Sequence, residues 1–129
     1  MVKTVLTDKM VKTGAELVRK LDDRGLQPDA AFWLYFPDLE QWKLVIAEVK
    51  VGKVGPKKIY QQIQKIITEF EDELADISLD DISLAKPDAP IIVLLRLGAK
   101  TGPGITNIRF QNNVINGTLI EDAHIYRVN

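Results

Sequence analysis

Seven consecutive apolar residues, AAFWLYF, lie between Pro28-Asp29 and Pro37. A run of this length, rich in aromatic side chains and bounded by proline, is typical of a strand that is covered on both faces. A second apolar stretch, WKLVIA, follows after the five residues PDLEQ, so the two stretches predict a hairpin. A sheet with two covered faces needs packing partners on each side, which favours a layered domain of helices and strands.

The chain of 129 residues has the size of a single domain. Its composition, 46% hydrophobic and 27% charged, is typical of globular proteins. The net charge of −1 gives no global bias toward nucleic acid or anionic membranes. There is no cysteine, which excludes thiolate chemistry and is compatible with a reducing cytoplasm. The first ten residues have no apolar core region, so no signal peptide is expected.

Helix and strand patterns continue along the chain. Thr13 and Glu16 form a capping-box pattern that predicts a first helix over about 13–24, with an earlier start as the alternative. Gly55-Pro56 opens a second helix, whose apolar stripe is Ile59, Ile63, Ile66, Ile67, Phe70 and Leu74. Residues 82–85 indicate a strand. Residues 89–98 favour a short helix ending at a glycine, although a buried strand is the alternative.

The C-terminal segment predicts a second hairpin. Asn116-Gly117 is a strong two-residue turn signal, and Asn112-Asn113 is the alternative turn. With the turn at 116–117, one face is expected to point to the core: Ile108, Phe110, Val114, Leu119, Ala123 and Ile125. The element order is then αββαβαββ. It predicts a single α+β domain, in which a mixed or antiparallel sheet forms from two hairpins and a central strand, with helices packed on it.

Asp29, Glu48 and Lys50 match the metal-binding signature of a PD-(D/E)xK nuclease. In that chemistry two carboxylates hold Mg²⁺, and a lysine orients the attacking water or stabilises the developing charge. Glu48 and Lys50 are expected on the same side of one strand because their spacing is two residues. These three residues, the nuclease set, define one candidate site. The simpler interpretation is a strand that ends in charged residues.

The register of the first hairpin decides whether the nuclease set can converge. Phe36 opposite Lys43 would place Asp29 beside the other two side chains, whereas Phe36 opposite Trp42 would turn Asp29 away. With 18 acidic residues and 12 lysines, roughly 1.7 acid-x-lysine matches are expected by chance, and one is found. The motif alone therefore does not establish a nuclease.

A second candidate site is the basic turn, defined as Lys53, Gly55, Lys57 and Lys58. A glycine and lysines at a helix N-terminus can bind a phosphate through backbone N–H groups and charge. The alternative is an ordinary strand-to-helix turn with lysines in solvent. The later segment GAKTGPG lacks the spacing of a Walker A loop and is interpreted as a flexible connection.

His124 is the only histidine in the chain, so any imidazole chemistry would have to use it. Alternation along the second hairpin places it on the outward face with Arg109, Gln111 and Asp122. Cross-strand polar pairs are routine on solvated sheets, which favours a surface role for these four residues.

Three stretches, TGAELVRKLDDRG (13–25), DAAFWLYFPDLEQWKLVIA (29–47) and TGPGITNIRF…ING…IEDAHIYR (101–127), resemble a family of small, uncharacterised bacterial proteins. The resemblance covers most of the chain and favours a helix at 89–98. It implies no activity, ligand or partner, and it transfers no functional residue. In that family the strand after LVIA tends to continue as Ser-Pro, so the resemblance does not imply a nuclease role for Glu48 and Lys50.

The sequence therefore leads to a non-catalytic, cytoplasmic α+β module without a resident metal or cofactor, acting by contact with another protein or by self-association. The reason for expecting a contact surface is the aromatic content of the first hairpin, which exceeds what a small core is expected to bury: Phe32, Trp33, Tyr35, Phe36 and Trp42. The alternatives are Mg²⁺-dependent phosphodiester cleavage by the nuclease set and phosphate or nucleic-acid binding at the basic turn.

Overall fold

The computed structural model of the chain describes residues 4–47 and 55–129. Within them, the helices are α1 (Asp8–Asp23), α3 (Pro56–Glu69) and α4 (Pro90–Ala99), with a 3-10 helix, η1 (Leu79–Asp81). The strands are β1 (Ala30–Phe36), β2 (Gln41–Ala47), β3 (Ile82–Ala85), β4 (Ile108–Ile115) and β5 (Thr118–Val128). They form a mixed five-stranded sheet in the order β3-β2-β1-β5-β4, and β2 and β3 are parallel. The predicted α+β fold is confirmed.

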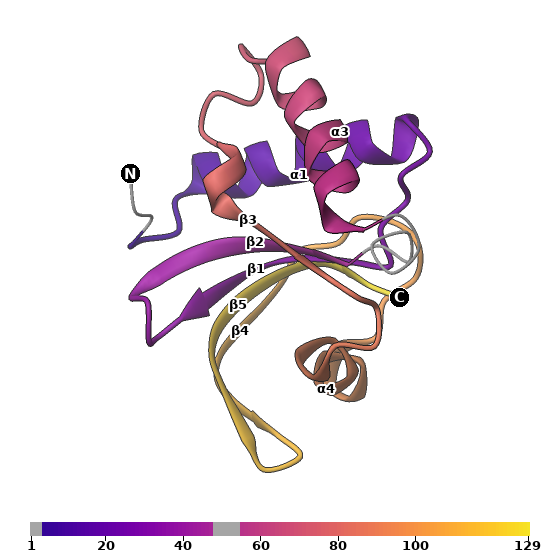
Figure 1. Ribbon diagram of the computed structural model, residues 1–129. Helices are drawn as coiled ribbons and strands as arrows, with labels where there is room; N and C mark the ends of the chain where they lie inside the picture. The colour runs from indigo at the N-terminus through magenta and orange to yellow at the C-terminus, as the bar shows by residue number, and fades with distance from the viewer. Residues whose placement is uncertain (1–3, 48–54) are drawn as a thin grey trace.

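The sheet has a hydrophobic core on each face. Helices α1 and α3 lie over one face and α4 lies under the other (Figure 1). Consecutive residues of β1 supply both cores, because Trp33 packs on the α1–α3 side and Phe32 on the α4 side, and both are fully buried. This arrangement confirms that the apolar run 30–36 is a strand covered on both faces.

The position of β3 differs from the sequence-based expectation of a central strand. β1 occupies the centre of the sheet, between β2 and β5, and β3 lies at one edge. The physical reason is burial: β1 is apolar on both faces, whereas only Ile82 is buried among the four residues of β3.

Both registers considered for the first hairpin are wrong. Phe36 lies opposite Gln41, and Leu34 lies opposite Lys43. The connection is shorter than expected, because β2 already begins at Gln41 and Glu40 adopts a left-handed φ of 51° that closes the turn. Glu48 and Lys50 lie outside the described residues.

The helix starts follow capping chemistry. Helix α1 begins earlier than the expected residue 13, because the Thr7 hydroxyl accepts a hydrogen bond from the Met10 N–H and caps it. Thr13 is inside the helix, and its hydroxyl donates to the Lys9 carbonyl. Helix α3 opens at Pro56 as predicted, and residues 90–99 form a helix and not a strand.

The second hairpin turns at Asn116-Gly117 as predicted, with Ile115 opposite Thr118. Four of the six side chains expected to face the core do so: Ile108, Phe110, Ala123 and Ile125. Val114 and Leu119 do not, since 68% and 57% of their surface is exposed.

The reason lies at Asn112, whose left-handed φ of 51° breaks the alternation of side chains along β4. Beyond this point Ile115 and Ile120 pack into the core on the α4 side. Val114 and Leu119 are consequently turned to solvent at the end of the hairpin, which extends away from the rest of the sheet (Figure 1).

Candidate functional site

A pocket of about 240 Å³ opens where the ends of α1 and β5 meet the loop before β1 and the loop around Pro103. The β1–β5 register is irregular beside it, because Ala31 pairs with Arg127 but Phe32 pairs with Ile125. The extra residue of this bulge places two consecutive side chains, Tyr126 and Arg127, on the α1 side of the sheet. Both are buried.

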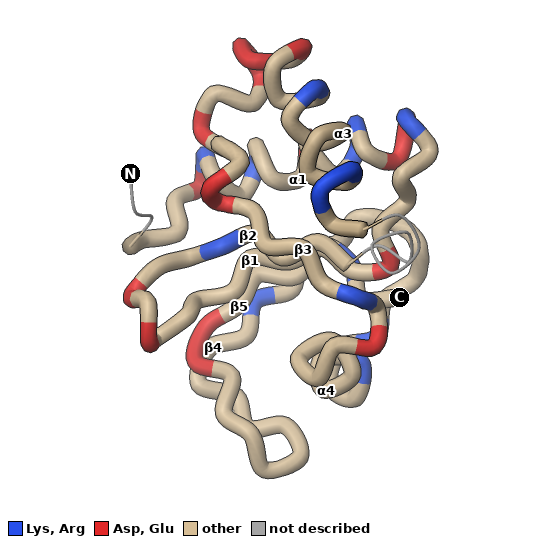
Figure 2. Tube along the Cα trace, in the orientation of Figure 1, with Lys and Arg blue, Asp and Glu red and all other residues tan. Residues whose placement is uncertain are grey.

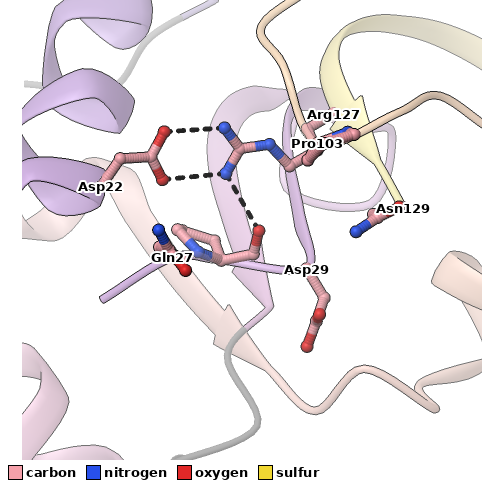
Figure 3. A pocket seen from close by; sticks show the side chains of 7 residues that line it. Asp22, Gln27, Asp29, Pro103, Arg127 and Asn129 are labelled. Carbon is pink, nitrogen blue, oxygen red and sulfur yellow. Dashed lines mark hydrogen bonds and ion pairs between the residues drawn. The ribbon is translucent and has the colours of Figure 1, made fainter. Parts of the chain in front are cut away.

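Arg127 lines this pocket and connects four segments of the chain. Its Nη1 and Nη2 donate to the two carboxylate oxygens of Asp22 at 3.0 and 2.7 Å (Figure 3). Nη1 also donates to the Pro28 carbonyl at 3.1 Å, and Nε donates to the Gly104 carbonyl at 3.2 Å. A two-pronged guanidinium–carboxylate pair with further carbonyl acceptors is a satisfied buried charge.

Asp29, the first member of the nuclease set, also lines this pocket. Its side chain is directed away from the Asp22–Arg127 pair (Figure 3). Its backbone N–H donates to the Ala47 carbonyl at 2.8 Å, and its carbonyl accepts from Asn129 at 2.9 Å. In residues 4–47 and 55–129, no three Asp, Glu or His side chains gather in a way that could hold a metal ion. We call Arg127, with Asp22 and the two carbonyls that it contacts, the clamp.

The clamp was not singled out by sequence reasoning. Its signal is a charged residue, Arg127, in the otherwise apolar strand end Ile125 to Val128. Its partner Asp22 is one of several charged residues at the end of a helix, and their sequence separation of 105 residues gives no indication of contact. Only the bulge brings them together.

The basic turn is partly described. Gly55 caps α3 with a φ of 87°, and its cap has no side-chain hydrogen bond. Lys57 and Lys58 are exposed, and Lys53 lies outside the described residues. Lys57 borders a groove that also contains the Asp80 carboxylate, so the described surface beside it carries both signs of charge.

His124 lies on the outward face predicted for it and is half-buried. Its Nε2 is 3.0 Å from Asn107 Oδ1, and Arg109 lies opposite it on β4. Arg109 is held by Asp122 through two hydrogen bonds of 2.6 and 2.9 Å. Burial, and then the neighbouring Arg109 charge, lower the pKa of His124, so the neutral imidazole is favoured.

The aromatic side chains of the first hairpin are largely covered. Phe32, Trp33 and Trp42 are buried, and Tyr35 and Phe36 are half-buried. Exposed apolar side chains also occur singly at Val5, Leu39, Val93 and Leu97. On the second hairpin, two of them, Val114 and Leu119, face each other across the strands. We call this pair the apolar tip.

At both edges of the sheet, a side chain accepts a hydrogen bond from a backbone N–H group of the edge strand. On β3, the Leu84 N–H donates to the Tyr60 hydroxyl at 3.2 Å. On β4, the Gln111 N–H donates to Asn113 Oδ1 at 3.1 Å. Such contacts reduce the capacity of an edge strand to pair with another strand.

Comparisons with protein-family models, with curated proteins and with solved structures found no match to this chain. In the described ranges, none of the helices has the length and apolar character needed to cross a membrane.

Proposed function

We propose that this chain is a non-catalytic module that works by self-association through the apolar tip. The observation that carries the proposal is the paired exposure of Val114 (68%) and Leu119 (57%) at the end of the β4–β5 hairpin. Single exposed apolar residues are ordinary, but two that lie side by side on a projecting hairpin offer a contact surface.

The charge distribution supports a second copy as the partner. Residues 111–120 contain no charged side chain. In Figure 2 the hairpin end is free of charge, whereas α1 and α3 carry charges of both signs and the loop after α3 carries acidic residues. A two-fold contact brings each surface against its own copy, so an uncharged surface avoids repulsion between like charges.

The hydrogen bonds at the two edge strands favour association by side-chain packing and disfavour association by adding a strand to the sheet. Because Tyr60 and Asn113 already accept hydrogen bonds from edge N–H groups, continuous strand addition would require both contacts to break. We therefore assign the association to the apolar tip and not to an edge strand. The absence of cysteine supports a cytoplasmic location in this proposal, since no disulfide has to form.

Sedimentation equilibrium tests the proposal with two matched substitutions. Val114→Asp places a charge at the contact and is expected to raise the dissociation constant at least about tenfold, which is ~1.4 kcal/mol. Val5→Asp makes the same change at a site that is equally exposed, 67% against 68%, but precedes α1. The control variant is expected to associate like the wild type.

A wild-type chain that stays monomeric at all attainable concentrations would contradict the proposal. Equal weakening by Val114→Asp and Val5→Asp would also count against it, since the effect would then follow from net charge and not from the apolar tip.

A further inference from the structure

A groove of about 420 Å³ lies beside the apolar tip, between the end of β1, the start of α4 and the first residues of β5. Most of the side chains along it are apolar: Leu34, Phe36, Pro37, Ile91 and Ile120. Glu121 is the charged residue among those that line it. We call this recess the tip groove.

The apolar tip and the tip groove share a residue. Leu119 belongs to the projecting pair and also lines the groove, so a projection and a recess of matching apolar chemistry are continuous on one surface. Leu34 and Phe36 are only half-buried, which leaves apolar area in the groove for a partner to cover.

We propose that the tip groove of each copy holds the apolar tip of the other, around a two-fold axis. This inference rests on the proposed self-association and specifies how the two surfaces meet. An axis between adjacent projection and recess places each tip over the opposite groove. The tip carries no charge that would have to be desolvated on entry, because residues 111–120 are uncharged.

Because the arrangement is reciprocal, the assembly is expected to stop at two copies. Each copy uses its one tip and its one groove, so two copies satisfy one another and leave no free surface of this kind for a third. The occupied edge N–H groups of Leu84 and Gln111 act in the same direction, because they oppose growth of the sheet beyond the pair.

Site-specific cross-linking tests this geometry, and the chain is suited to it because it contains no cysteine. One full-length variant carries Val114→Cys in the tip, and a second carries Ile91→Cys in the groove. Any disulfide in a mixture of these single-cysteine chains joins two different molecules. We expect oxidation of the mixture to give a tip-to-groove product as the main cross-linked species.

Two further cysteine variants serve as controls for the cross-linking experiment. Pro37→Cys places the thiol on an exposed wall of the groove and provides a second groove position, should Ile91→Cys disturb folding. Gln62→Cys lies on an exposed position of α3, on the opposite side of the sheet, and measures linkage by random collision. Its yield with Val114→Cys is expected to be several-fold lower than that of the groove variants.

The possible outcomes separate this inference from the proposed function. A tip-to-groove product together with a dimer by sedimentation supports both. A dimer that yields only tip-to-tip products overturns the groove contact and leaves self-association standing. Assemblies that grow beyond two copies overturn the two-fold axis, and a strict monomer overturns the inference and the proposed function together.

Discussion

Arg127 is a charged residue held almost entirely out of water, with 4% of its surface exposed. It is tolerated because Asp22 neutralises it, and the backbone carbonyls of Pro28 and Gly104 accept two further N–H groups. A buried ion pair contributes little net stability when it is intact, but it costs several kcal/mol when one member is removed. The clamp thus fixes how β5, α1 and two loops are joined.

Replacing Arg127 tests this role. Arg127→Met removes the charge and is expected to lower the free energy of unfolding by about 3 kcal/mol, because Asp22 and two carbonyls lose their donor. Arg109→Met removes the matching two-pronged pair with Asp122, where the arginine is 39% exposed, and is expected to cost at most about 1 kcal/mol. Urea unfolding measures both, and equal losses would refute the distinction.

His124 gives the fold a dependence on pH. Its pKa is lowered in the folded state by burial and by Arg109, while the unfolded chain titrates near the ordinary value of about 6.5. The unfolded state then binds more protons than the folded state. The contribution of neutral His124 to the stability of the fold is therefore complete above pH ~6.5 and declines as the pH falls below that value.

The pH dependence is testable with a single substitution because the chain has no other histidine. We expect wild-type stability to fall between about pH 6.5 and pH 5, and His124→Asn to flatten the curve in this window. Thermal unfolding across the pH series measures it. Identical slopes for the two proteins would show that the His124 charge state does not matter.

Helix α1 packs on the sheet through a close contact at Gly14. Trp33 Nε1 donates to the Tyr126 hydroxyl at 3.0 Å, and that hydroxyl donates to the Val11 carbonyl at 2.5 Å. A Cβ at Gly14 would overlap the Tyr126 hydroxyl and lie 2.7 Å from Trp33 Nε1. The glycine therefore allows the helix to approach two rigid, hydrogen-bonded rings.

Two helical glycines give a matched comparison of this packing. Gly14→Ala is expected to destabilise the fold by about 1–3 kcal/mol, although alanine is intrinsically the better helix former. Gly98→Ala would meet the flexible end of Ile115 at 2.7 Å and is expected to change stability by less than about 1 kcal/mol. Denaturant unfolding midpoints measure both changes in stability. An unchanged midpoint for Gly14→Ala would show that the close contact of Gly14 with Trp33 and Tyr126 does not restrict the residue at this position.

At the scale of the whole molecule, the two faces of the sheet differ in the elements and charges that border them. The face under α1 and α3 is bordered by charged residues and ion pairs, such as Lys20 with Glu73 and Arg24 with Glu69. The opposite side carries α4 and the uncharged end of the β4–β5 hairpin. Charged residues also border α4, but residues 111–120 at the hairpin end carry none, which fits the proposed self-association.

Local patterns determined most of the elements from sequence alone. The covered strand 30–36, the proline-initiated helix at 56 and the turn at Asn116-Gly117 each follow from residue periodicity or backbone preference. These signals are local, since the residues that define each element are neighbours in the chain. The nuclease set stays a sequence hypothesis, because Glu48 and Lys50 lie outside the described residues.

Tertiary structure decided what depends on contacts between distant residues. The bulge that brings Arg127 to Asp22, the register that pairs Phe36 with Gln41 and the turning of Val114 to solvent each follow from one backbone irregularity. A shift of one residue in a strand exchanges the two faces of the sheet, and such a shift leaves no trace in local composition. The exposure of Val114 and Leu119 was not predicted although the hairpin register was, because the left-handed backbone at Asn112 gave no signal in the sequence pattern.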